Sequence, residues 1–255
     1  IFGKPEKFNL VELGPGDGSL TKVLIETFKK FPKIKEATNI FLYEKSNLLK
    51  NVQKRNIKND RVKWIDNFDN IKKGPVIFFG NEFFDAIPIK QFTIERNTIK
   101  EKCYLINNLG LNEIYRKAKP KDISTIKSFK VFNKAKFIEY PKLGLGELNK
   151  VIEKISELSG GVLLIDYGEQ NLIDKNTLQL VMKNKKIKID NLIESLGKAD
   201  ITSLVNFSLL KEYFIKKNLN VEKIVSQKFF LEKMGIIERA KILEKKMTAK
   251  QKEYM

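Results

Sequence analysis

A glycine-rich turn near the start of the chain constrains the fold more than any other feature. The apolar run Phe8–Leu13 predicts a buried strand, and residues 14–18 carry a glycine at every second position. From Ser19 onward, apolar residues recur at helical spacing until Pro32 ends the pattern. Either Ser19 or Asp17 can cap the start of this helix. A buried strand, a tight glycine turn and a helix, in this order, are typical of an α/β sheet with parallel strands.

The same alternation of short apolar runs and helical patterns continues along the chain. Further strands are predicted at Asn39–Tyr43, Arg61–Ile65, Pro75–Phe79, Val162–Ile165 and Val221–Ser226. Helices are predicted at Ser46–Lys54, Leu148–Leu158 and Phe207–Lys217. Strands separated by helices favour a parallel, Rossmann-like α/β sheet with helices on both faces.

Residues 91–140 interrupt this alternation. Gln91–Tyr104 has the pattern of a strand pair with a hairpin turn at Arg96-Asn97, and the rest of the segment is rich in lysine and irregular. We therefore predict one domain whose halves, residues 1–90 and 141–240, are separated by an inserted segment that contains β structure. Residues 241–255 are predicted to form a charged helix or tail.

The composition excludes several classes of protein. The 42% hydrophobic content supplies a full core, which excludes disorder as the main state. The longest apolar runs are about four residues, whereas a membrane-spanning helix needs roughly 20. The chain has one cysteine and no histidine, so an internal disulfide is impossible, and we expect neither a metal site of the usual zinc type nor a histidine-based triad.

The net charge of +18 points only weakly to nucleic acid. Lysine accounts for 44 of the 49 basic residues and arginine for five. A surface selected to bind phosphate favours arginine, whose planar fork contacts phosphate bidentately. We attribute the lysine excess to A/T-biased codon usage and regard nucleic-acid binding as the weaker reading.

The glycine turn is the first candidate binding element, because ligands of open parallel sheets lie beyond the carboxyl ends of the strands. Gly14, Gly16 and Gly18 have the spacing G-x-G-x-G, with Pro15 inside the turn and Glu12 two residues before the first glycine. A dinucleotide-binding turn would place its third glycine one residue later. The acid favours a ligand with a cationic amino acid end, such as S-adenosylmethionine. A turn without ligand and a nicotinamide or flavin site remain alternatives.

Polar residues also follow the next two predicted strands. Glu44 comes directly after the second strand, where an acid accepts hydrogen bonds from both ribose hydroxyls. Asp66 and Asn67 follow the third strand, where they could contact an adenine edge. Both NAD and S-adenosylmethionine carry this ribose, and a solvated charge or an ordinary turn would give the same pattern.

The segment Gly80–Pro88 follows the fourth predicted strand, where a transferred methyl group would face its acceptor. It contains Asn81, Glu82 and Asp85 beside two phenylalanines, and acids in such surroundings are costly to bury without a purpose. The two carboxylates could orient a guanidinium by bidentate hydrogen bonds while one of its nitrogens attacks the methyl. The alternative is a helix-capping Asn81 or Asp85 with Glu82 in solvent.

These motifs together resemble the MidA-like family of S-adenosylmethionine-dependent methyltransferases. The matching segments are, in order, Glu12–Leu20, Asn81–Ile89 with Gln91-Phe92, Asp166–Gly168, Thr177–Gln179, Ala199–Thr202 and Val205–Phe207. The resemblance implies a seven-stranded methyltransferase sheet, with the methionine part of the cofactor near the glycine turn and the ribose at Glu44. Mitochondrial members assemble respiratory complex I and methylate an arginine of one of its subunits.

The resemblance therefore implies a protein arginine methyltransferase, mitochondrial in a eukaryote and cytoplasmic in a bacterium. We expect Glu82 and Asp85 to orient the acceptor and Asn81 to lie between cofactor and acceptor. Leu204 and Asn206 stand where the family has His and Asp. The chain begins at Ile1, without the family's N-terminal segment, and we expect a fragment or a processed product.

Two other functions remain open at this stage. One is a non-catalytic assembly factor that retains the cofactor site. The other is a nucleic-acid methyltransferase, whose motif after the fourth strand has two prolines where this chain has Glu82 and Phe83.

Overall fold

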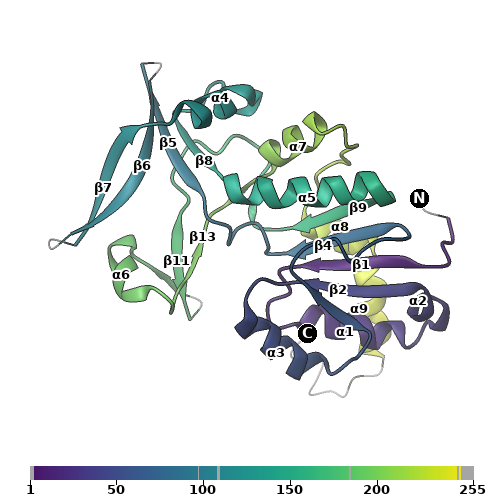
Figure 1. The fold of residues 1–255 in the computed structure, drawn as a ribbon. Helices are drawn as coiled ribbons and strands as arrows, with labels where there is room; N and C mark the ends of the chain where they lie inside the picture. Colours follow the sequence, from purple (N-terminus) through teal and green to yellow (C-terminus); the bar gives the residue numbers. More distant parts are fainter. Residues whose placement is uncertain (1–2, 97, 108–109, 184, 246, 248–255) are drawn as a thin grey trace. The chain divides into compact units, whose positions relative to one another are not determined.

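The computed structural model describes residues 3–96, 98–107, 110–183, 185–245 and 247 (Figure 1). The chain divides into two compact units, residues 1–220 and residues 221–255. None of the described helices is both long enough and apolar enough to cross a membrane.

A five-stranded parallel sheet forms the centre of the larger unit. Its strands are β1 (Phe8–Leu13), β2 (Thr38–Tyr43), β3 (Val62–Ile65), β4 (Val76–Asn81) and β9 (Gly160–Ile165), in the order β3-β2-β1-β4-β9. The strand order reverses between β1 and β4, because β2 lies on one side of β1 and β4 on the other. Such a switch point opens a crevice at the carboxyl ends of the strands, which is where parallel sheets bind their ligands.

Helices cover both faces of this sheet, as predicted. Side chains alternate between the two faces along a strand, so odd-numbered and even-numbered residues of β2 enter different cores. On one face, helix α5 (Lys142–Leu158) contributes Val151 and Ile155 to a core that contains Val11 and Phe78. On the other face, α1 (Ser19–Phe28) and α3 (Asn47–Ile57) contribute Ile25 and Ile57 (Figure 1).

A second sheet occupies the chain between β4 and β9. Its strands are β5 (Lys90–Glu95), β6 (Thr98–Asn107), β7 (Gly110–Lys117) and β8 (Phe137–Tyr140), antiparallel in the order β7-β6-β5-β8. The prediction of an irregular stretch up to Tyr140 was wrong. The segment also contains helix α4 (Pro120–Ser128) and the short 3-10 turn η1 (Lys130–Phe132). In the predicted hairpin turn, Arg96 has a left-handed backbone conformation, and Asn97 lies outside the described residues.

The larger unit ends in short elements after β9. Strand β10 (Gly168–Glu169) pairs with β14 (Val205–Asn206), while β11 (Gln179–Met182) pairs with β12 (Lys185–Ile187) and β13 (Asp200–Thr202). The helical elements are η2 (Ile189–Asn191), α6 (Leu192–Ser195) and α7 (Phe207–Lys216). The smaller unit contains α8 (Gln227–Lys233) and α9 (Ile236–Glu244).

The structure corrects several boundaries. The parallel sheet of the described residues has five strands, not the seven that the resemblance implied. Residues 221–226 form no strand. Pro32 begins the short helix α2 (Pro32–Ala37) instead of ending α1, since proline at the first helical turn lacks only an N–H that would have no partner there. The predicted tail falls partly on α9, and residues 246 and 248–255 lie outside the described part.

Candidate active site

The glycine turn lies at the carboxyl end of β1 and leads into α1. Its three glycines all have left-handed backbones, with φ of 61°, 56° and 84° for Gly14, Gly16 and Gly18. The turn is closed by a hydrogen bond from the Gly18 N–H to the Pro15 carbonyl, 2.8 Å. Gly18 itself occupies the cap position of α1, and the Asp17 carboxylate accepts from the Ser19 N–H at 2.9 Å. At Gly16 an added Cβ would meet no atom within 4 Å, so the turn borders open space.

Glu12 is a buried carboxyl group at the edge of this turn. It is 3% exposed and its Oε2 accepts a hydrogen bond from the Thr21 hydroxyl. In the part of the chain that the structure describes, no lysine or arginine forms an ion pair with it. Burial raises the pKa of Glu12 to about 7, only partly offset by the Thr21 hydrogen bond. A buried acid without a cationic partner is well suited to receive an ammonium group from a ligand.

Glu44, predicted to bind a ribose, is held by a polar network below the turn. One of its carboxylate oxygens accepts from the Ser46 N–H at 2.8 Å and the other from Gln53 Nε2 at 3.1 Å. Gln53 is fully buried; its Nε2 also donates to the Gly16 carbonyl at 2.8 Å, and its Oε1 accepts from Trp64 Nε1 at 2.9 Å. Sequence reasoning missed Gln53. The sequence pattern that could have found it is helical spacing: Gln53 lies four positions before the buried Ile57 and therefore on the same inner face of α3.

Replacing Gln53 with Leu is expected to weaken cofactor binding by about tenfold and to destabilise the fold by about 1–3 kcal/mol, because the Gly16 carbonyl and the Trp64 N–H lose a buried partner. Titration with S-adenosylhomocysteine and chemical denaturation measure the two effects. The exposed Asn51 of the same helix offers the control Asn51→Leu, which should change neither. Equal affinities of the Gln53 variant and the wild type would show that the network does not shape the site.

Asp66 and Asn67 do follow β3, but their side chains have local partners. Asp66 is largely exposed and forms an ion pair with Lys50. The Asn67 side chain accepts from the Asp69 N–H at 3.1 Å. No described hydrogen bond joins either side chain to the glycine turn.

The segment after β4 is a tight loop fastened to the end of β9. Asn81 is the last residue of β4 and is exposed. The exposed Glu82 has a left-handed backbone, φ 51°, and its N–H donates to the Ile165 carbonyl at 2.9 Å. Asp166 accepts through one oxygen from the N–H groups of Phe84, 2.7 Å, and Asp85, 3.2 Å. This carboxylate therefore fixes the conformation of the loop that presents Glu82 and Asp85.

The glycine turn and the loop after β4 are neighbours. A Cβ built on Gly14 would lie 2.9 Å from Phe83 Cδ2, and one built on Gly80 would lie 3.0 Å from Phe83 Cβ. The Phe83 ring thus packs directly on the first glycine of the turn. The predicted cofactor and acceptor segments lie next to each other, on adjacent strands at the carboxyl edge of the sheet.

Residues of this loop also line a cleft of about 750 Å³. Its walls come from Glu82, residues 85–91, strand β6, Leu178 and residues 199–203. Burial raises the pKa of the half-buried Asp85 to about 6, with the nearby carboxylate of Asp166 as the next cause and smaller effects from Glu82 and Asp200. The glycine turn does not line this cleft, so cofactor and acceptor have separate candidate spaces.

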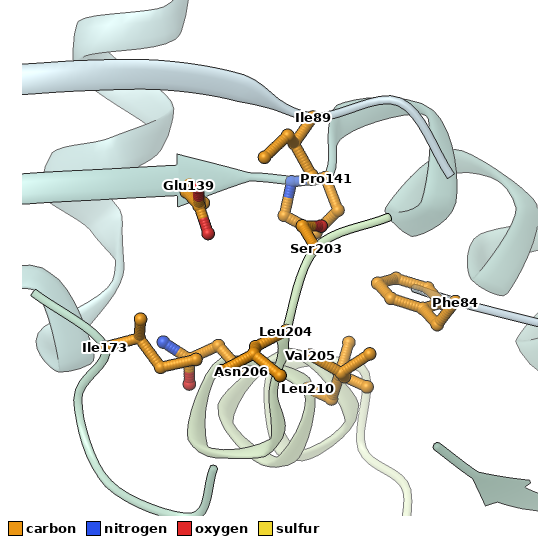
Figure 2. Close-up of a pocket in the computed structure, with 10 residues that line it drawn as sticks. All are labelled: Phe84, Ile89, Glu139, Pro141, Ile173, Ser203, Leu204, Val205, Asn206 and Leu210. Atoms are coloured by element: carbon orange, nitrogen blue, oxygen red, sulfur yellow. The ribbon is translucent and has the colours of Figure 1, made fainter. Parts of the chain in front are cut away.

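A small cavity of about 20 Å³ is lined by Phe84 and by Leu204 and Asn206, the two positions at which the sequence departs from the motif that it resembles (Figure 2). Two of its polar side chains already have hydrogen-bond partners. Glu139 accepts from the Thr177 hydroxyl and, at 2.9 Å, from the Thr177 N–H, while Asn206 caps α7 by accepting from the Leu209 N–H at 2.9 Å. The cavity is large enough for about one water molecule.

Comparison with known proteins identifies the family. Residues 1–225 match the model of a family described as "Putative S-adenosyl-L-methionine-dependent methyltransferase". The chain belongs to this family. It is 27% identical over 269 residues to the mitochondrial protein arginine methyltransferase NDUFAF7 of Danio rerio, covering 94% of this chain and 62% of the relative. The Caenorhabditis elegans homologue is 24% identical, with 94% of this chain and 61% of the relative covered. The chain thus spans about three fifths of the length of these relatives.

The fold also matches a solved structure. A Burkholderia thailandensis protein bound to S-adenosyl-homocysteine superposes with a TM-score of 0.75 at 18% identity, covering 98% of this chain and 65% of that protein. At this identity the likeness establishes the fold, a parallel α/β sheet with flanking helices. The family resemblance drawn from the sequence motifs is confirmed.

Proposed function

We propose that this chain is an S-adenosylmethionine-dependent methyltransferase that modifies a protein side chain, an arginine. The observation that carries the proposal is Glu12, a buried acid without a cationic partner beside an open glycine turn. The amino acid end of S-adenosylmethionine supplies the missing ammonium group. Membership of the methyltransferase family and similarity to proteins named protein arginine methyltransferases support it.

In this proposal Glu12 binds the ammonium group, and the turn of Gly14, Pro15, Gly16 and Gly18 leaves room for the methionine part. Glu44, held by Gln53, accepts hydrogen bonds from the ribose hydroxyls. The adenine lies toward Asp66 and Asn67, and Asn81 separates cofactor from acceptor. The sulfonium of the bound cofactor supplies an electrophilic methyl group.

The chain's own residues position the acceptor. Glu82 and Asp85 hold the guanidinium by charge-assisted hydrogen bonds, so that one nitrogen points toward the glycine turn across Phe83. Asp166 fixes their loop through the Phe84 and Asp85 N–H groups. With a pKa raised to about 6, Asp85 is mostly ionised at neutral pH and can take up the proton that the nitrogen loses.

The wider context is also proposed. Residues 91–140 are an insertion between residues 1–90 and 141–240. Strand β4 precedes this segment in the chain and β9 follows it, and the two strands pair directly with each other. The protein substrate to test first is a subunit of respiratory complex I. Relatives are named mitochondrial, which supports the mitochondrial matrix as the location in a eukaryote, with the cytoplasm as the counterpart in a bacterium.

The test is transfer of a labelled methyl group from S-adenosylmethionine to the candidate complex I subunit, with its arginines replaced by lysine in a control. Arginine-dependent labelling is the expected result. Binding of the subunit and the cofactor without labelling would contradict the proposed methyl transfer. It would favour the alternative function, an assembly factor that retains the cofactor site.

A further inference from the structure

The cleft beyond the loop after β4 carries acids that no basic side chain neutralises. Its two lysines are both paired: Lys90 with Glu101 at 3.0 Å and with Asp122 at 2.6 Å, and Lys102 with Glu113 at 2.5 Å. Glu82, Asp85 and Asp200 also line the cleft, and within the described ranges none of them forms an ion pair. Three unpaired carboxylates in one cleft stand out in a chain with a net charge of +18.

The same cleft wall contains a buried hydrogen-bond acceptor without a donor. Gln91 is 4% exposed, and its Nε2 donates to Glu139 at 2.8 Å and to Asn176 at 2.7 Å. Both partners accept the hydrogen bond through an oxygen. Glu139 is a carboxylate, and the Asn176 oxygen is identified by the Leu178 N–H, which also donates to it at 3.1 Å. The amide orientation is therefore fixed, and Gln91 Oε1 has no donor in the described structure. A buried oxygen of this kind favours a ligand with N–H groups.

Organic cations fit this cleft better than a metal ion does. No group of three potential metal-ligating side chains gathers anywhere in the described part of the chain. The volume of about 750 Å³ lies within the range of sites that hold a molecule much larger than one side chain. Asp200 lies on β13, a different element from the loop that carries Glu82 and Asp85.

We propose that the cleft binds a peptide segment with two cationic side chains: the acceptor arginine at Glu82 and Asp85, and a neighbouring lysine or arginine at Asp200. This inference rests on the proposed function and adds a specificity-determining residue to it. Asp200 lies close enough to raise the pKa of Asp85, so a cation placed at Asp200 also favours the ionised form of Asp85 that holds the acceptor.

The test uses labelled synthetic peptides that share a central arginine and differ at one neighbouring position, which is Lys, Gln or Glu. Binding is followed by fluorescence anisotropy in the presence of S-adenosylhomocysteine, so the readout does not need turnover. The wild-type chain should prefer the Lys peptide over the Gln peptide by about fivefold. Asp200→Asn should abolish this preference, and Asp200→Lys should reverse it in favour of the Glu peptide. Asp60→Asn, at an exposed acid outside the cleft, should retain the wild-type preference.

Two results would overturn the inference: a lysine preference that survives in Asp200→Asn, or no binding of any peptide. A parallel assay of methyl transfer separates it from the proposed function. Charge-selective binding that depends on Asp200, without transfer, supports the peptide cleft and contradicts the methyltransferase. Transfer to all peptides without charge selection supports the methyltransferase and rejects the role of Asp200.

Discussion

Replacing Glu82 with Gln is expected to reduce methyl transfer by about two to three orders of magnitude and to leave cofactor affinity within about twofold of the wild type. Glu82 is exposed at the mouth of the cleft, and its left-handed backbone is held by the bond from its N–H to the Ile165 carbonyl. The amide keeps the shape of the side chain but removes the charge that orients the guanidinium. The loss should therefore fall on turnover and not on the cofactor.

The measurement compares single-turnover rates with labelled S-adenosylmethionine and binding of S-adenosylhomocysteine by calorimetry. Glu169→Gln is the matched control, since Glu169 is an exposed acid beyond β9 that does not line the cleft. Unchanged turnover in the Glu82 variant would remove this residue from the mechanism.

Replacing Glu12 with Gln is expected to lower cofactor affinity by about a hundredfold, because a neutral amide cannot balance the ammonium group at a buried site. The same change should stabilise the unliganded chain at high pH. The pKa of Glu12 is raised from 4.5 to about 7 by burial, so the folded state holds this proton more tightly than the unfolded state does. The resulting stabilisation is complete below pH 4.5 and is lost as the pH rises through 7. At pH 8 the wild type has lost up to about 3 kcal/mol of its free energy of unfolding, and the Gln variant has not.

Denaturant unfolding of both proteins at pH 4 and at pH 8 tests this linkage. The variant should gain stability over the wild type only at pH 8, while Glu6→Gln, at an exposed acid, should match the wild type at both values. A variant less stable than the wild type at pH 8 would contradict the account of Glu12 as an unpaired buried acid.

The parts of the fold that sequence could predict are those specified locally. Strand β1 and the glycine turn were found because the apolar run and the positions that need left-handed backbone adjoin in the chain. Strand β7 was missed because six of its eight residues are exposed and none is buried, which leaves no alternation of buried and exposed positions to read. The start of α5 was placed too late because of its early glycines. Gly144 is required there by the Phe84 ring, which would lie 2.7 Å from an added Cβ.

The site contacts that sequence missed join residues far apart in the chain. Asp166 reaches the Phe84 N–H across 82 positions, and Gln53 reaches the Gly16 carbonyl across 37. Neither contact follows from a local pattern, because both depend on how neighbouring strands and helices pack. The sequence could name the acids of the site, and only the fold could show which groups hold them in place.

The most direct test of the central claim is a calorimetric titration of the chain with S-adenosylmethionine and S-adenosylhomocysteine, with NADH as a control, repeated on Gly16→Val. At φ 56° valine is strained by about 1–3 kcal/mol, and its side chain would fill the open space beside the turn. We predict saturable binding of both sulfur compounds to the wild type, no binding of NADH, and loss of binding in the folded variant. Binding of NADH, or equal binding of the sulfur compounds to Gly16→Val, would contradict the assignment of the turn as the cofactor site.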